Sequence, residues 1–249
     1  MASSPGSLAS LDGTVMLASE ATIPATDDGL IRGDGVFEVI RLYDGRPFAF
    51  GRHLARLERS AENLRLPLDL EAIRADAWRL LAQAGTDSEH ELLRILVTRG
   101  GRRLLLTEPM PPNAEIVRLA SVTYSPTRIL DGIKSLSYGA NMLASRLARE
   151  RGFDEALLVT PHGRVLEAPT SSIFWVEDGE LLTPPLDELL AADEAFLAST
   201  TREVQPISAI DERTFDAPGP VTAQTAEVAE ALVRKQLEAE TQQLSADTR

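Results

Sequence analysis

Apolar residues recur at helical spacing in four stretches of the chain. In the first stretch, Leu54, Leu57 and Ala61 fall on one face of a helix that we expect over 53–64. Glycines follow two of the other stretches and mark where those helices end, because glycine tolerates the positive φ of a helix C-terminus. The remaining helices are expected over 70–85, 140–151 and 221–240, and Thr222 is expected to start the last one.

Short apolar runs bounded by turn residues predict the strands. Gly33-Asp34-Gly35 forms a tight turn before the first long strand, since glycine adopts positive φ without strain. Asp44-Gly45 and Asp178-Gly179 are two-residue turns of the kind that join hairpins. The strands are expected over 36–42, 92–98, 116–122, 155–160, 164–167, 171–176, 180–183 and 195–199.

A change of composition near residue 124 predicts a boundary between two domains. Tyr124-Ser125-Pro126-Thr127 places proline and small polar residues between two apolar runs. We expect a small α/β N-terminal domain over 1–123 and a larger C-terminal domain over 124–249. The fold class is therefore α/β with a mixed, α+β character.

Composition excludes several classes of protein. The chain has no cysteine, so it has neither a disulfide nor a thiolate nucleophile, and its three histidines lack the spacing of a zinc site. A net charge of −13 argues against a nucleic-acid binder. No run of eighteen apolar residues spans a membrane, and residues 1–10 do not resemble a signal peptide. We expect a cytoplasmic protein without a metal site.

The lysine count draws attention to one residue. Lys134 and Lys235 are the only lysines, whereas the other basic residues are 23 arginines. A lysine amine can lose its proton and attack an aldehyde, which an arginine does not do. Lys235 lies in a polar helical pattern, whereas Lys134 lies in an apolar strand-like context. Chance placement is the alternative explanation for either one.

Three further features have the chemistry that pyridoxal 5′-phosphate (PLP) requires around a lysine. Glu167 leads into a loop of small hydroxyl residues, as suits a partner of the pyridine nitrogen. Arg56 is a helical cation, and the hydroxyls and amides of Ser199-Thr200-Thr201 follow a strand, so both can bind a phosphate. Each feature taken alone is also consistent with an ordinary surface residue.

Seven segments spread from about Gly33 to Val221 have the order and spacing of one known family. They are 33–38, 53–57, 133–138, 154–158, 163–167, 171–176 and 192–201. Together they resemble the class IV aminotransferases of the branched-chain and D-amino-acid type, a family that includes aminodeoxychorismate lyase. The resemblance implies PLP fold type IV, with a larger domain built on a barrel-like sheet, and a homodimer with its site near the interface.

The resemblance also implies roles for individual residues. Lys134 forms the Schiff base with PLP and moves the proton, Glu167 pairs with the pyridine nitrogen, and Arg56 holds the phosphate with help from Thr200. Thr170 and Ser171 belong to the same cofactor-binding stretch.

Four other residues correspond to the substrate side of the family's site. Phe37 and Tyr138 are expected at the substrate pocket. Arg102 or Arg103 lies in the loop from which some members bind a substrate carboxylate.

The chain departs from the family pattern in two places. Ala168-Pro169 replaces the glycine that usually follows the glutamate, and proline lacks an amide N–H. After Leu186, a whole unit with a phosphate-binding turn is expected to be missing. Each lost charge-assisted contact costs roughly 1.5–3 kcal/mol, so cofactor affinity depends on whether this deletion is real.

Three functions remain open at this point. The first is transamination between an amino acid and a 2-oxo acid. The second is a lyase that eliminates pyruvate from aminodeoxychorismate to give 4-aminobenzoate. The third is a non-catalytic relative that dimerises or binds a ligand, which the gap after Leu186 would favour.

Overall fold

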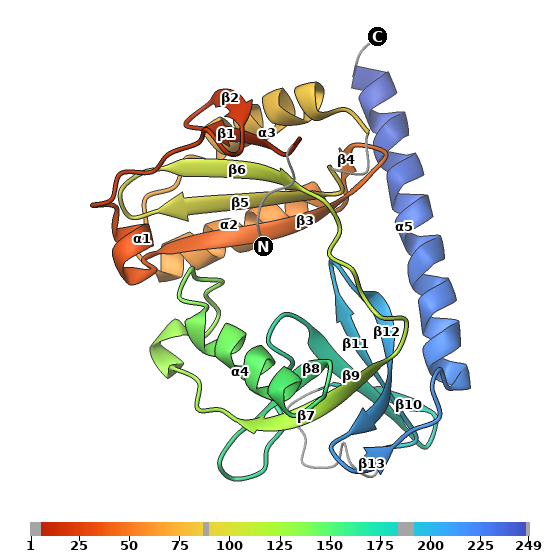
Figure 1. Cartoon of the computed structure of the whole chain (residues 1–249). Coiled ribbons are helices and arrows are strands. Elements are labelled where there is room, and N and C mark those ends of the chain that lie inside the picture. The colour runs from red at the N-terminus through yellow and green to blue at the C-terminus, as the bar shows by residue number, and fades with distance from the viewer. Residues whose placement is uncertain (1–5, 87–89, 184–191, 248–249) are drawn as a thin grey trace. The chain divides into compact units, whose positions relative to one another are not determined.

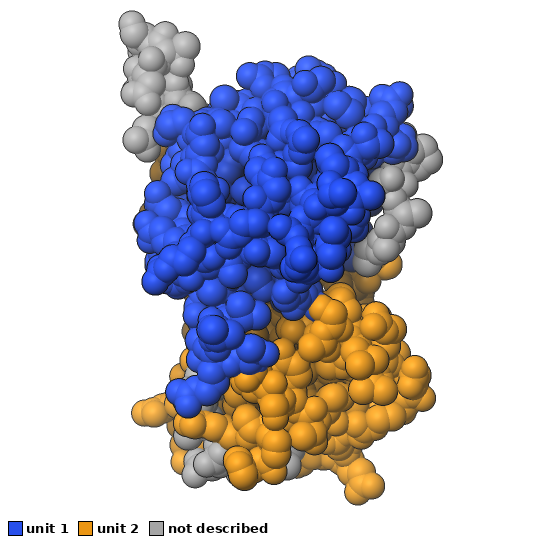
Figure 2. Space-filling view, turned by 90° about the vertical axis from the view of Figure 1, so that its left-hand side faces the viewer, with its two compact units in different colours: residues 1–111, 127–138 blue, residues 112–126, 139–249 orange. Residues whose placement is uncertain are grey.

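The structure, a computed structural model, describes residues 6–86, 90–183 and 192–247. It forms two compact units, which Figure 2 shows in different colours. The first contains 1–111 and 127–138, and the second contains 112–126 and 139–249. These units differ from the single boundary expected after residue 123. The reason is that the segment containing Lys134 packs with the first unit, where Ser135 forms a β-bridge to Val36.

The first unit contains a six-stranded sheet in the order β2-β1-β6-β5-β3-β4 (Figure 1). All of its strand pairs are antiparallel. Asp44 and Gly45 both have positive φ, so they form the two-residue turn that the sequence predicts between β3 and β4. The strands are β1 (Leu8–Leu11), β2 (Thr14–Leu17), β3 (Gly35–Tyr43), β4 (Arg46–Pro47), β5 (Leu92–Thr98) and β6 (Arg103–Glu108).

Two long helices, α2 (Phe50–Asn63) and α3 (Leu70–Ala84), cover one face of this sheet (Figure 1). The predicted stripe of α2 is confirmed, because Leu54, Leu57 and Ala61 are all buried in the core that the helices share with the sheet. The short helix α1 (Asp28–Arg32) precedes β3, and the 3₁₀ turn η1 (Arg128–Leu130) precedes Lys134.

The second unit contains a mixed sheet in the order β10-β9-β11-β12-β7-β8, with β13 paired to β12 (Figure 1). The strands β7 and β8 are parallel, as are β12 and β7, and the other pairs are antiparallel. This sheet does not close into a barrel within the described residues. The strands are β7 (Val117–Thr123), β8 (Glu155–Val159), β9 (Ser172–Glu177), β10 (Glu180–Leu182), β11 (Glu194–Ser199), β12 (Glu203–Ile210) and β13 (Arg213–Thr214).

Helices α4 (Gly139–Glu150) and α5 (Pro220–Asp247) belong to the second unit. The sequence placed the start of α5 at Thr222, and this is wrong, because the helix begins at Pro220, where proline lacks the N–H that a first turn leaves unbonded. The buried carboxylate of Glu194 accepts hydrogen bonds from the N–H groups of Val221 (3.0 Å) and Thr222 (2.7 Å). A side chain from β11 therefore caps this helix.

One predicted strand is also wrong. Residues 164–167 make only an isolated bridge, between Val165 and Val159. The N–H of Leu158 donates to the carbonyl of Glu167, and the carbonyl of Leu158 accepts from the N–H of Leu166. Leu166 and Glu167 therefore both lie opposite Leu158, as in a β-bulge. The other predicted strands and helices are present, with ends displaced by a few residues. Within the described residues, no helix is long and apolar enough to cross a membrane.

Candidate active site

The backbone around Lys134 is fixed between a strand and a helix of the first unit. The N–H of Phe37 donates to the carbonyl of Lys134 (3.0 Å), and the N–H of Leu136 donates to the carbonyl of Gly35 (2.9 Å). The N–H of Lys134 donates to Oγ of Ser60 in α2 (3.1 Å). These bonds hold the lysine at the start of β3, although the segment itself is not a strand.

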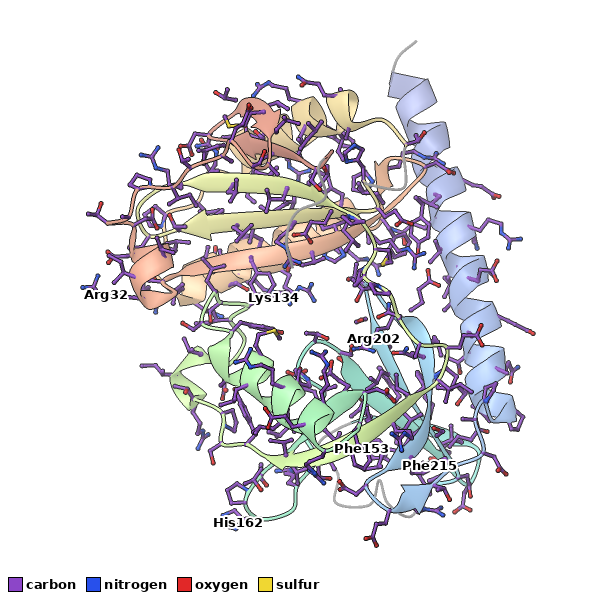
Figure 3. All side chains as sticks on the ribbon, viewed as in Figure 1. Arg32, Lys134, Phe153, His162, Arg202 and Phe215 are labelled. Atoms are coloured by element: carbon purple, nitrogen blue, oxygen red, sulfur yellow. The ribbon has the colours of Figure 1, made fainter. Side chains whose placement is uncertain are left out.

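Two aromatic rings surround the amine of Lys134, which Figure 3 labels. Its Nζ lies 4.4 Å from the ring centroid of Phe37 and 5.8 Å from that of Tyr138. The two rings meet edge to face, with 5.2 Å between their centroids. Both distances from Nζ are within the range of cation–π attraction, which stabilises an ammonium group. The structure thus brings together three residues that the sequence assigned to the cofactor and substrate.

Arg56 is bound through two hydrogen bonds to a buried carboxylate. Its Nε and Nη2 donate to the two oxygens of Glu38, at 2.5 and 2.6 Å. The Nδ1 of His53 lies 2.9 Å from one of the same oxygens. The side chain of Glu38 is fully buried, whereas that of Arg56 is 46% exposed.

These contacts change the ionisation of both partners. Burial raises the pKa of Glu38, but the hydrogen bonds and charges of Arg56 and His53 outweigh it, so that this pKa lies below its ordinary value. The hydrogen bond to Glu38 raises the pKa of Arg56. The pair is therefore ionised at neutral pH. The sequence predicted a cation at Arg56 but did not identify Glu38 as its partner.

Arg56 and Ser60 are four residues apart on α2, so they lie on the same side of the helix. Since Ser60 accepts the N–H of Lys134, the turn of α2 that carries Arg56 is adjacent to the segment that carries the amine. An amine, two aromatic rings and a half-exposed guanidinium thus belong to one region of the first unit. These are groups suited to an aromatic aldehyde that bears a phosphate.

The second unit holds the other residues predicted to bind the cofactor. Thr170 and Glu167 are exposed, whereas Ser171 is buried. Pairing of Ala198 with Ser172 brings the end of β11, followed by Thr200, close to the start of β9, preceded by Ser171. Hydroxyl groups therefore gather at one edge of this sheet. The Oγ of Ser171 is buried and has no hydrogen-bond partner among the described residues, which is rare for a buried polar atom.

A buried ion pair next to these hydroxyls was not predicted. Arg202, labelled in Figure 3, follows Thr201 and donates to Oε2 of Glu155 (2.9 Å) and to Oε1 of Gln205 (2.5 Å). Burial lowers the pKa of Arg202, while the charge of Glu155 raises it. An arginine directly after a hydroxyl run was the only visible signal, since its carboxylate partner lies 47 residues away.

Arg102 and Arg103, predicted to meet a substrate carboxylate, pair with carboxylates of the chain itself. Nη1 of Arg102 donates to Asp12 (2.7 Å), and Nε of Arg103 donates to the buried Asp76 (3.0 Å). Nε of Arg102 is buried without an acceptor among the described residues. Both arginines thus help to hold the first unit together, and a substrate role stays a prediction.

No cluster of three or more histidine, cysteine, aspartate or glutamate side chains in the described part of the chain can hold a metal ion.

Comparison with known proteins identifies the family. The family model for class IV aminotransferases matches residues 35–190, and the chain belongs to this family, whose cofactor is PLP. A putative branched-chain-amino-acid aminotransferase from Methanocaldococcus jannaschii is 30% identical, with 83% of this chain and 88% of the relative covered. A bifunctional aminodeoxychorismate lyase and D-amino acid transaminase from Mycobacterium tuberculosis is 29% identical, with 70% of each covered.

Solved structures agree with this assignment. A fold IV transaminase from Curtobacterium pusillum superposes with a TM-score of 0.81 and 27% identity, with 94% of this chain and 99% of that chain covered. The fold class predicted from the sequence is therefore confirmed.

One relative contains residues that this chain lacks. The alignment with the Methanocaldococcus protein extends over 255 residues and yet includes only 83% of a chain of 249. The relative must then have residues without a counterpart here. The deletion expected after Leu186 lies outside the described residues and stays a prediction.

Proposed function

We propose that this chain is a PLP-dependent aminotransferase that moves an amino group between an amino acid and a 2-oxo acid, with Lys134 as the reactive amine. The main support is the position of Nζ, 4.4 Å from the ring centroid of Phe37 and beside Tyr138. PLP supplies, when bound, an aldehyde for amines and a ring that withdraws electrons.

Each of the site residues in the first unit has its own proposed role. Lys134 Nζ binds the cofactor and afterwards takes up the proton that leaves the substrate Cα. Arg56 donates to the phosphate, as a guanidinium suits its oxygens. Phe37 and Tyr138 confine the amine and form an apolar wall for the substrate side chain.

The residues of the second unit have proposed roles of their own. Glu167 pairs with the pyridine nitrogen and keeps it protonated. Thr170, Ser171 and Thr200 donate hydroxyl hydrogen bonds, for which the unpartnered Oγ of Ser171 is the direct support. Arg102 is the better candidate for a substrate carboxylate, since its side chain is 40% exposed and that of Arg103 is 25% exposed.

The test uses the two lysines of the chain. Purified protein is incubated with PLP and its absorbance recorded, then borohydride is added and the labelled peptide is mapped. We expect the label on Lys134, its loss in Lys134→Ala, and its retention in the matched control Lys235→Ala. An amino acid alone should then convert the bound cofactor to its amine form. A label only on Lys235 would refute the proposal.

A lyase activity is the second candidate. It is favoured by the relative from Mycobacterium tuberculosis, whose name combines aminodeoxychorismate lyase with D-amino acid transaminase. Release of pyruvate from aminodeoxychorismate, without conversion of the cofactor by an amino acid, would identify a lyase. Both reactions in one preparation would identify a bifunctional enzyme.

We also propose that the protein forms a homodimer. The support is a set of exposed apolar side chains in the first unit, Leu30, Ile31 and Ile129. Light scattering after size exclusion should give twice the mass of the chain. A monomer at micromolar concentration would contradict this.

A further inference from the structure

We propose that Glu38 is a positioning residue that fixes the guanidinium of Arg56 so that its remaining donors bind a phosphate group. This deepens the proposed function, because it rests on Arg56 as the phosphate ligand. His53 supports the same carboxylate from the neighbouring turn of α2.

The two partners differ sharply in exposure. Glu38 is fully buried with both oxygens engaged by Arg56, while the arginine side chain is nearly half exposed. The buried carboxylate of Glu38 therefore holds the guanidinium of Arg56 from one side. The opposite side of the guanidinium faces away from Glu38.

The donor inventory of arginine shows what remains for a ligand. A guanidinium has five N–H donors in a planar fork, and Glu38 occupies one on Nε and one on Nη2. The two Nη1 hydrogens and the second Nη2 hydrogen lie on the outer edges of the plane, where Nη2 is also 3.4 Å from Nδ1 of His53. An Nη1 and an Nη2 hydrogen together can donate to two oxygens of a phosphate in parallel.

Glu38 also sets the kind of anion that suits the site. Its charge offsets much of the charge of Arg56, so net attraction for a simple anion is weak. Binding then depends on directed hydrogen bonds from a guanidinium whose rotamer is already fixed. A tetrahedral oxyanion with two accessible oxygens satisfies these donors, and a spherical anion such as chloride does not.

The architecture explains why the carboxylate can hold this geometry. Glu38 lies in β3, where its backbone pairs with Ile95 of β5. His53 and Arg56 are three residues apart on α2, so both reach the same carboxylate. Glu38 therefore connects the rigid sheet to the helix that carries the ligand-binding arginine.

The same unit offers a matched control. Arg94 and Glu108 form a second bidentate pair, with Nε and Nη2 donating to the two oxygens at 2.7 and 2.8 Å. Arg94 lies in β5 and Glu108 in β6, and neither has been assigned to the cofactor. Glu108→Gln thus removes an equivalent pair without touching Arg56.

The first experiment compares PLP with pyridoxal, which lacks the phosphate. Dissociation constants of both are measured for the wild type, Glu38→Gln, Arg56→Gln, the double variant and Glu108→Gln. We expect Glu38→Gln to lower the preference for PLP over pyridoxal about tenfold, the size of one lost charge-assisted contact. In the double variant, Glu38→Gln should lower this preference little beyond the effect of Arg56→Gln. Glu108→Gln should leave the preference unchanged.

The second experiment needs no aldehyde chemistry. Line broadening of inorganic phosphate in ³¹P NMR should show binding to the wild type and to Lys134→Ala, and weaker binding to Glu38→Gln. Glu38→Asp keeps the charge but shortens the side chain, and it replaces Glu38→Gln if the latter does not fold. Glu38→Asp is also expected to show a lower preference for PLP over pyridoxal than the wild type.

The outcomes separate this inference from the proposed function. If Arg56→Gln lowers the preference for PLP but Glu38→Gln does not, or if Glu38→Gln weakens PLP and pyridoxal equally, the positioning role is refuted. If phosphate binds through both residues but no label appears on Lys134, the aminotransferase proposal fails while the positioning role is supported.

Discussion

The Nζ atom of Lys134 lies 4.4 Å from the ring centroid of Phe37, so this amine is in contact with an aromatic ring contributed by β3. The rings of Phe37 and Tyr138 meet edge to face, with 5.2 Å between their centroids. This arrangement depends on two hydrogen-bonded segments, since Phe37 also donates its N–H to the carbonyl of Lys134. The ring is thus fixed relative to the lysine backbone as well as to its amine.

Phe37→Leu should slow the amino-acid half-reaction while the PLP label on Lys134 is retained. Leucine keeps an apolar side chain but removes a cation–π contact and an aromatic pair, together about 1–2 kcal/mol. We therefore expect a rate roughly 5–30-fold lower in single-turnover measurements. Phe48→Leu is the matched control, because Phe48 also meets a tyrosine, Tyr43, edge to face. An unchanged rate in Phe37→Leu would remove the ring from the mechanism.

Arg103→Ala should destabilise the first unit. The change leaves the carboxylate of Asp76, whose side chain is 4% exposed, with Arg79 as its remaining cation at 3.3 Å. We expect unfolding in urea to show a loss of about 1–3 kcal/mol, smaller in an Asp76→Asn background. If Arg103 instead binds a substrate carboxylate, as the sequence predicted, Arg103→Ala should raise the KM for the 2-oxo acid and leave the stability unchanged. Measuring both quantities on one variant separates the two roles.

The sequence predicted the structural features that depend on residues close together in the chain. The Asp44-Gly45 and Asp178-Gly179 turns were found because both residues of each turn must adopt positive φ, which these residue types tolerate. The buried stripe of α2 followed from helical spacing. The lysine count singled out Lys134. Family resemblance then gave this residue its role and assigned its aromatic neighbours Phe37 and Tyr138 to the same site.

Contacts between distant elements were not predictable in this way. Glu38 and Arg56 are 18 residues apart, and Glu194 and Thr222 are 28 apart, so no local pattern indicates either pair. Each is a carboxylate on a strand that meets a helix, which only the packing of the two elements decides. The bulge at 164–167 was missed for a related reason, since alternation of side chains does not reveal two residues opposite one.

Glu194→Ala should destabilise α5 without changing cofactor affinity. The carboxylate accepts from the N–H groups of Val221 and Thr222, and its removal leaves both donors without a partner. Burial raises the pKa of Glu194, but these hydrogen bonds hold it below the ordinary value, so the capping group is charged at neutral pH. We expect a loss of about 1–2 kcal/mol and faster hydrogen exchange confined to the first turns of α5.

The neutral analogue Glu194→Gln provides the control for this experiment. It keeps one acceptor oxygen, so it should retain part of the stability that alanine loses. Equal stability of the wild type and the alanine variant would show that the first turn of α5 is satisfied by other groups.

The ion pair of Glu38 should make the stability of the protein sensitive to acid. The pKa of this carboxyl in the folded chain lies below the ordinary value of 4.5 that applies in the unfolded chain. The unfolded chain therefore binds the proton more tightly, and protonation favours unfolding. The stabilisation is complete above about pH 4.5 and is lost as the pH falls through the lower, folded pKa. Glu38→Gln carries no such group, so it should be less stable than the wild type by about 1–3 kcal/mol at pH 7.

The difference between these two proteins is the quantity to measure. Unfolding free energies from urea titrations between pH 7 and pH 3 contain contributions from many carboxylates, but most of these cancel in the comparison. We expect the gap between wild type and Glu38→Gln to be constant down to about pH 5 and to narrow below it, because the wild type alone loses the ion pair. A gap that stays constant down to pH 3 would show that the pKa of Glu38 is the same in the folded and unfolded chains, and a gap that widens as the pH falls would show that folding raises this pKa.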